Sequence, residues 1–464
     1  MDPARQPDRA AGSVKAVAAS LTAQGLLEQE SRALLTRLDR LDYFAFIEPM
    51  VAAAAPSPEA RIAVEKYLVE NWRNLRELVK QQIRHLRESR SRVPASELMQ
   101  RNFVLLRLKF NAMLADFDTF ADVFTQRSET NYGVWIAGLD VAATDALRIE
   151  AKGMEMPPVV CYLDRGHGAA IRRARTRLAT GRANPVAIVR VPRERMVGSG
   201  IAASLFHEVG HQGAALLDLV SSLRRVLRAR QIVAGPQQLP WVLYERWISE
   251  IVADFWSVAR LGIGATLGLM GVVSLPRAFV FRAHLDDPHP VPWFRLMLSC
   301  AMGRELYPDA QWEQLARAWV EFFPLQDLAP QERDFFRRLL ATIPEFSRML
   351  AEHQAPSLGG RTLREALETR GREPERLRRA YRRWREDPRA MYAARPSMAF
   401  AVLGQARASG LLTPEGESRA VLALLRSWAL RRSLGEGTEK PKCHCRPARR
   451  GSSNNEFVEG ESHV

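Results

Sequence analysis

The chain has 464 residues, of which 47% are hydrophobic and 26% are charged, and its formal net charge is +15. This length exceeds what one simple core holds, so we expect two or three packed units. Four cysteines in so long a chain exclude a disulfide framework.

The N-terminal part of the chain is predicted to be helical. Residues 1–12 are polar and charged and no apolar signal core follows them, so we expect a flexible start and a cytoplasmic location. Apolar residues then recur at helical spacing through residues 13–127, with a proline-bearing break at residues 55–58. This stretch is predicted to form a helical domain of its own.

Three short segments before residue 200 have the composition of strands. Residues 186–191 are rich in β-branched residues and follow a turn signal at residues 181–185. Residues 132–136 and 159–163 are further candidates. A small sheet among many helices predicts an α+β fold that is mostly helical.

The pentapeptide His207-Glu208-Val209-Gly210-His211 places two imidazoles four residues apart. On a helix both rings lie on one face, where they can share one zinc ion, and Glu208 can take a proton from a water bound to that metal. Glycine inside a helix costs roughly 1 kcal/mol relative to alanine. We therefore expect another segment to approach Gly210 closely.

A second cluster follows at Glu250 and Asp254, again one helical turn apart. A catalytic zinc site needs a third protein ligand, and Glu250 can supply it from a facing helix. Asp254 can accept the spare ring N–H of a ligand histidine and so hold its tautomer. The flanking residues are strongly apolar, which is a costly setting for unpaired carboxylates.

Together, HExxH and the later Glu-x-x-Ala-Asp resemble the gluzincin group of zinc metallopeptidases. The resemblance implies one zinc ion held by His207, His211 and Glu250. It also implies a zincin-like catalytic unit over residues 128–300, with a small sheet and metal-binding helices, flanked by helical segments.

Within that group, Gly210 and a later His-Pro-x-x-x-x-Arg element are similar to the CAAX prenyl endopeptidases and the bacterial heat-shock membrane proteases. Here the element runs from His289 to Arg295. The resemblance implies that His289 steadies an oxyanion and that Arg295 is a buried charge partner of Asp254. Read without it, His289 is a turn residue and Arg295 a solvated helix cation.

The chain departs from that family in two respects. Ser249 stands where gluzincins commonly have asparagine, and the family's membrane spans are missing. The longest apolar run, residues 261–276, is too short for a comfortable span and is rich in glycine. We expect it to form a buried helix behind the active site, and prenylated substrates are not implied.

The sheet of a zincin-like fold offers a way to bind peptides, because an extended chain can add to its edge strand. If residues 186–191 form that edge, then Val186, Ile188 and Arg190 line the substrate. The alternative is an ordinary buried strand, and the sequence leaves both open.

Beyond residue 300 the helical pattern returns. Breaks at Pro324, Pro330, Gly359-Gly360 and Pro388 predict a C-terminal helical subdomain over residues 301–434, followed by a disordered tail over residues 435–464.

The strongest arginine cluster, residues 376–389, interleaves Tyr381 and Trp384. Acidic residues are mixed in, so we expect a solvated, salt-bridged helix face in preference to nucleic-acid binding. An acidic partner would be attracted by the positive charge of these arginines.

These observations predict a zinc metalloendopeptidase that hydrolyses a peptide or protein substrate through a metal-activated water, with Glu208 as general base. Two alternatives remain. One is a catalytically silent, zinc-binding scaffold built on a metallopeptidase fold. The other is an arginine-rich nucleic-acid-binding protein with a chance HExxH.

Overall fold

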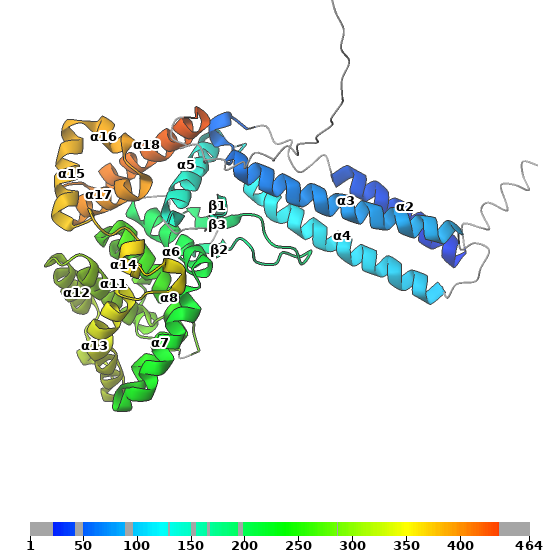
Figure 1. Ribbon diagram of the computed structural model, residues 1–464. Helices are drawn as coiled ribbons and strands as arrows, with labels where there is room; N and C mark the ends of the chain where they lie inside the picture. The colour runs from blue at the N-terminus through cyan, green and yellow to red at the C-terminus, as the bar shows by residue number, and fades with distance from the viewer. Residues whose placement is uncertain are drawn as a thin grey trace, which may run out of the picture.

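The structure, a computed structural model, describes residues 22–41, 50–88, 96–128, 130–149, 155–164, 168–193, 198–284 and 286–435. Figure 1 shows a body of helices around a small sheet, with an arm of long helices projecting to one side. Helices dominate, and the only sheet in the described residues is mixed and three-stranded. The predicted helix-dominated α+β class is confirmed.

The arm consists of α2 (Ala23–Leu41), α3 (Pro58–Glu88) and α4 (Ser96–Thr125). In α3 the buried residues recur every three or four positions, which directs one stripe of the helix toward α2 and α4. The helix begins at Pro58, because proline has no N–H to contribute and is tolerated in the first turn. The short 3-10 turn η1 (Ala52–Ala54) precedes it, so the predicted break at residues 55–58 is confirmed.

The sheet contains β1 (Val159–Asp164), β2 (Ala170–Arg172) and β3 (Ala187–Pro192), in the order β1-β3-β2. β1 and β3 are parallel, and β2 is antiparallel to β3. The predicted strands at residues 159–163 and 186–191 are therefore confirmed, apart from their end residues.

Two strand predictions were wrong. β3 is the central strand, hydrogen-bonded on both sides, so the segment carrying Val186, Ile188 and Arg190 offers no free edge to a peptide. Residues 132–136 lie in helix α5 (Thr130–Leu147), which packs against β1. A short apolar run fits either periodicity, and here the run continues as the buried face of a helix.

The rest of the body is built from helices. Its α-helices are α6 (Ser199–Leu216), α7 (Leu219–Val233), α8 (Gln238–Leu261), α9 (Ile263–Val273), α10 (Arg277–Val280), α11 (Pro292–Leu306), α12 (Gln311–Phe322), α13 (Pro330–Ala351), α14 (Leu363–Ala366), α15 (Pro374–Glu386), α16 (Pro388–Ala393), α17 (Pro396–Ala408) and α18 (Pro414–Ser433). Its 3-10 turns are η4 (Gly235–Gln237), η5 (Leu325–Asp327) and η6 (Pro356–Leu358). No helix among the described residues is both long enough and apolar enough to cross a bilayer.

One hydrophobic core extends from α5 through the sheet and α8 to α18. Its largest members are buried tryptophans, namely Trp241, Trp247, Trp256, Trp293, Trp312 and Trp319. Cys161 and Cys300 are free and buried. This core joins the C-terminal helices to α6 and α8, so together they form a rigid frame for the side chains between them.

The predicted helix breaks after residue 300 are confirmed. α13 and α16 begin at Pro330 and Pro388, and Gly359 and Gly360 have φ values of 61° and 83°. The last described helix ends at Ser433. The division into units at residues 127, 300 and 434 stays a prediction, and residues 1–12 and 436–464 lie outside the described residues.

Candidate metal centre

The HExxH segment is helical, as predicted. It lies within α6, which begins after Gly198, a residue with a φ of 68° that only glycine adopts readily. His207 and His211 are one turn apart on the same face, with ring centroids 4.8 Å apart and ring planes at 87°. The helix therefore presents two imidazole nitrogens toward one point.

Gly210 allows α8 to approach α6. A Cβ atom added at Gly210 would lie 3.0 Å from both Cα of Ala253 and Cβ of Trp256. The expectation that another segment passes close to this glycine is confirmed. Because the two helices approach this closely, the carboxylates of α8 come within reach of the histidines of α6.

Glu250 completes a cluster of three ligand atoms. Its Oε2 lies 3.3 Å from Nε2 of His207, and its Oε1 lies 3.4 Å from Nε2 of His211. All three side chains offer a ligand atom within 4.8 Å of the others, and no other such group occurs in the part of the chain that the structure describes. Two imidazoles and one carboxylate from rigid helices are the donor set of a three-ligand zinc site, so the residues fit a metal ion.

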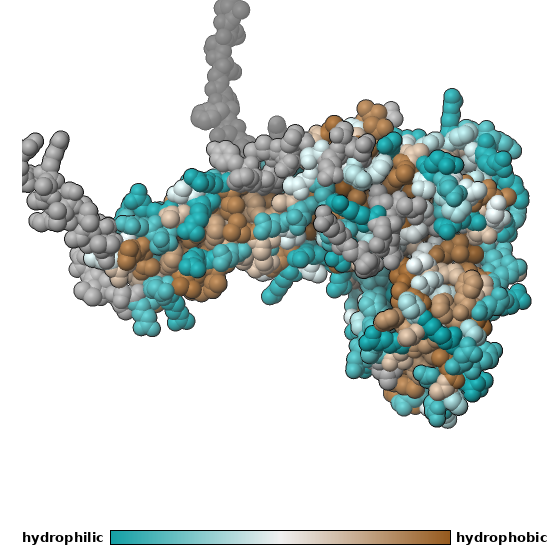
Figure 2. Space-filling view, turned by 180° about the vertical axis from the view of Figure 1, so that it is seen from behind, coloured by the Kyte–Doolittle hydropathy of each residue, from teal (hydrophilic) through white to brown (hydrophobic). Residues whose placement is uncertain are grey.

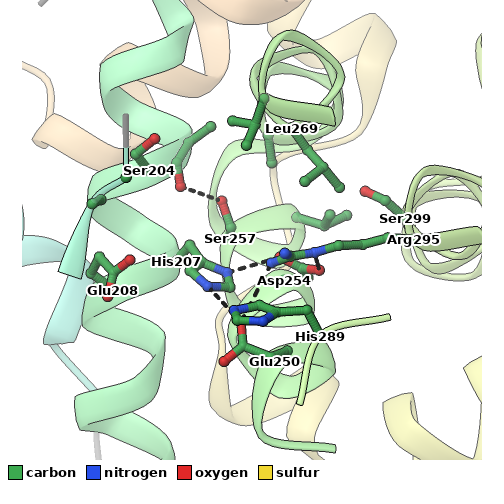
Figure 3. A pocket seen from close by; sticks show the side chains of 16 residues that line it. Ser204, His207, Glu208, Glu250, Asp254, Ser257, Leu269, His289, Arg295 and Ser299 are labelled. Carbon is green, nitrogen blue, oxygen red and sulfur yellow. Dashed lines mark hydrogen bonds and ion pairs between the residues drawn. The ribbon is translucent and has the colours of Figure 1, made fainter. Parts of the chain in front are cut away.

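Asp254 lies behind the cluster and contacts both His207 and Arg295. Its Oδ1 is 2.8 Å from Nδ1 of His207, although the ring N–H does not point straight at that oxygen. Arg295 donates two hydrogen bonds to the carboxylate, at 2.6 and 2.8 Å. The expected pairing of Asp254 with Arg295 is present, as Figure 3 shows.

The charges of the cluster support one another. Burial alone would raise the pKa of Asp254, but Arg295 and His207 outweigh it and lower that pKa to about 2. Burial also opposes ionisation of Glu250, yet its contacts with His207 and His211 lower its pKa. Burial would lower the pKa of His207, whereas Asp254 and Glu250 raise it to about 9. When His207 gives up its proton to bind a metal, two ionised carboxylates beside one guanidinium leave a net negative charge that attracts the cation.

Glu208 differs from these groups because it is buried without a protein partner. Its side chain makes no hydrogen bond or ion pair to any described residue, and the residue is only 8% exposed. Burial raises its pKa, which the charges of His207 and His211 only partly offset. A carboxyl in this environment accepts a proton more readily than an exposed one.

His289 stands at the rim of the site, with its side chain 52% exposed. Its Nε2 lies 3.4 Å from Oε2 of Glu250, and its Nδ1 lies 2.8 Å from Oδ1 of Asp287. Asp287 also accepts the backbone N–H of His289 at 2.9 Å. These contacts orient the ring toward the metal cluster. The aspartate two residues earlier was the sequence signal, and sequence reasoning missed it.

Most of these side chains, though neither His211 nor Asp287, line one cavity of about 160 Å³. In Figure 3, Ser204 and Glu208 come from α6, and Leu269 and Ser299 project from the opposite side. The cavity lining consists of Gly168, Ala169, Ala203, Ser204, His207, Glu208, Glu250, Asp254, Ser257, Val258, Ala265, Leu269, Val272, His289, Arg295 and Ser299. The predicted buried helix at residues 261–276 corresponds to α9, which supplies the apolar wall.

The three substrate-binding residues predicted on the strand do not line this cavity. Val186 and Ile188 are buried in the core that the sheet shares with the arm, and Arg190 pairs with Asp164 at 3.3 Å. Gly168 and Ala169, which precede β2, reach the cavity instead. Strand order depends on long-range pairing, and no local signal in the sequence identified β2 as a strand.

Comparisons of the chain with known protein families, with curated proteins and with solved structures found no match.

Proposed function

We propose that this protein is a zinc-dependent metallopeptidase. The observation that carries the proposal is the convergence of His207, His211 and Glu250, with Glu208 buried and unpaired on the same cavity wall. A structural zinc site is closed by a fourth protein ligand and does not need an unpaired carboxyl beside the metal.

The metal and the protein have separate tasks. When bound by His207, His211 and Glu250, zinc supplies a Lewis acid that polarises a carbonyl and acidifies water. Glu208 accepts the proton of the attacking water at its carboxylate and later delivers it to the leaving amine. The raised pKa of Glu208 brings the carboxyl closer to the pH at which both transfers are efficient.

His289 is placed to stabilise negative charge that develops on the substrate. Its Nδ1 contacts Asp287, and its Nε2 lies on the cavity side, 3.4 Å from Oε2 of Glu250, where a ring N–H would donate to an oxyanion. The Asp287 contact holds the ring in this orientation, so Asp287 is a positioning residue for His289.

The substrate is an extended peptide. β2 pairs only with β3 among the described strands, and the chain just before β2 reaches the cavity, so the outer edge of β2 can take a peptide backbone. Ala265, Leu269 and Val272 of the cavity wall suit an apolar side chain of that peptide.

The experiment that tests the proposal measures zinc content together with cleavage of an unfolded protein substrate. Glu208→Gln keeps the three ligands, so we expect unchanged zinc content and a loss of cleavage by at least about 100-fold. If Glu208→Gln cleaves as fast as the wild type, Glu208 is not the base. Zinc binding without cleavage in the wild type would instead indicate the silent scaffold.

Glu250→Ala tests the third ligand. Losing one of three protein ligands should lower zinc retention during dialysis, whereas Glu245→Ala on the same helix should leave it unchanged. Glu245 is the matched control because it pairs with Arg228 and Gln231, away from the cluster. Equal zinc retention in the two variants would contradict the assignment of Glu250.

A further inference from the structure

The turn between α7 and α8 exposes an unusual amount of apolar surface. Ile232 is 83% exposed, the highest fraction among the large hydrophobic side chains of the described residues, and its neighbour Val233 is 71% exposed. Val226, Leu239 and Val242 of the same helix pair are also exposed. We call residues 226–242 the hairpin tip.

The figures place this surface at an end of the molecule. In Figure 1, α7 runs toward the lowest part of the body, away from the arm. Figure 2 shows hydrophobic surface among hydrophilic atoms at that lower end. The η4 turn that links the two helices contains no buried residue, so the tip projects into solvent.

Cations surround the apolar tip. Residues 219–242 contain Arg224, Arg225, Arg228 and Arg230 and no acidic residue. Arg228 and Arg230 pair with Glu245 and Glu345. Arg224 and Arg225 are exposed, and neither has a carboxylate within ion-pair distance in the described part of the chain. On a helix they lie about 10 to 12 Å from Ile232 along the axis.

We propose that the hairpin tip docks on an anionic lipid surface. An interfacial helix buries its apolar side chains about 5–10 Å deep, while cations at the level of the headgroups attract anionic lipids. The apolar and cationic residues follow this order along α7: Ile232 and Val233 are at its end, and the arginines lie about half a turn to two turns before them. The cations select an anionic bilayer over a purely apolar protein partner, which would gain nothing from them.

Docking would also fix the distance of the metal cluster from the membrane surface. Glu250 lies twelve residues after Gln238, the first residue of α8, which corresponds to about 18 Å of helix. The cavity would then face chain segments close to the membrane surface. This last step rests on the proposed function, whereas the docking itself does not.

The test is co-sedimentation of the full chain with vesicles of phosphatidylcholine, with and without phosphatidylserine. We expect binding only to the vesicles with phosphatidylserine, weakening as salt is added. Ile232→Ser/Val233→Ser should lower the affinity by about 100-fold, because each buried side chain loses about 1.5 kcal/mol of apolar transfer, or about tenfold in affinity. Arg224→Gln/Arg225→Gln should lower it about fivefold for each cation removed.

The control is Ile62→Ser/Leu98→Ser on the arm, where two side chains of 64% and 58% exposure are changed. It should bind vesicles like the wild type.

Equal losses of affinity in the Ile232/Val233 and the Ile62/Leu98 serine variants would overturn the proposal. Failure of the folded wild type to bind anionic vesicles at low salt would overturn it as well. A tip variant that changes self-association and leaves vesicle binding intact would assign the tip to contacts between copies and overturn it too. Glu208→Gln should still bind vesicles, so docking and hydrolysis fail separately.

Discussion

Asp254 connects two charged groups that would otherwise be costly to bury. Its carboxylate lies 2.8 Å from Nδ1 of His207 and accepts two hydrogen bonds from Arg295. It therefore orients a metal ligand on one side and neutralises a buried guanidinium on the other. Outer partners of this kind contribute to metal affinity without touching the metal.

Asp254→Asn should weaken both functions. We expect zinc affinity to fall about 10- to 100-fold, because His207 loses its orienting carboxylate. We also expect the free energy of unfolding to fall by about 3 kcal/mol, because buried Arg295 loses both hydrogen bonds to a carboxylate and keeps only its 3.6 Å contact with Glu250. Competition with a chelator measures the first quantity, and urea denaturation measures the second.

Asp254→Asn/Arg295→Gln separates the two effects. Removing both charges should recover part of the lost stability but none of the zinc affinity. Recovery of zinc affinity in the double variant would show that Asp254 acts through Arg295 alone and not through His207.

At the scale of elements, the distance between α6 and α8 decides whether the site forms. The histidines belong to α6 and Glu250 belongs to α8. The two helices approach at Gly210 and also at Gly213, where an added Cβ atom would lie 2.2 Å from the ring of Trp256. Both glycines have a low helix propensity, but the absence of a side chain at these positions permits the close packing.

Gly210→Ala should separate the two helices. Although alanine favours a helix by about 1 kcal/mol, the new methyl group would meet backbone atoms of α8 that cannot move aside. We expect a net destabilisation of about 1–3 kcal/mol and weaker zinc binding. Gly271→Ala is the control, because an added Cβ meets nothing within 4 Å there. If Gly210→Ala is as stable as the control variant, the contact is not tight.

The first half of the arginine cluster of α15 is paired with carboxylates. Glu375 lies within 4 Å of the guanidinium groups of Arg378, Arg379 and Arg382. Tyr381 and Trp384 pack against the hydrophobic core. These ion pairs are those expected of a salt-bridged helix face, and the partner of this region stays a prediction.

Across the whole molecule, charged contacts join α5 to the C-terminal helices. Asp145 of α5 accepts hydrogen bonds from Arg395 and from the backbone N–H of Ser397, both at 2.8 Å. Burial alone would raise the pKa of Asp145, but Arg395 and Ser397 outweigh it and lower that pKa. The ionised carboxylate therefore stabilises the packing of α17 against the body.

Acid should remove this stabilisation. Because the pKa of Asp145 is lower in the folded protein than in the unfolded chain, its contribution is complete above the ordinary carboxyl pKa and is lost as the pH falls through the lower folded value. Asp145→Asn should cost about 1.5–3 kcal/mol near neutral pH. Its difference from the wild type in urea denaturation should shrink below about pH 4. A difference that stays constant with pH would contradict the assigned charge.

Local periodicity was enough to identify most of the candidate site. Residues four apart on a helix share a face whatever the rest of the fold does, so His207 and His211, like Glu250 and Asp254, could be paired from spacing alone. Gly210 likewise predicted close packing. Glycine lowers helix stability relative to alanine, so its place inside a helix indicates that another segment passes too close for a side chain. The apolar run at residues 261–276 predicted a buried helix, which is α9.

Long-range packing decided the rest. Strand order depends on pairing between distant segments, so only the tertiary structure placed β3 in the centre of the described sheet and β2 at its edge, directly after the cavity residues Gly168 and Ala169. Residues 132–136 became helical because they continue a face that packs on β1. The exposure of Ile232 could not be predicted from the sequence either. Isoleucine is usually buried, and only the tertiary structure shows that no other segment covers this one among the described residues.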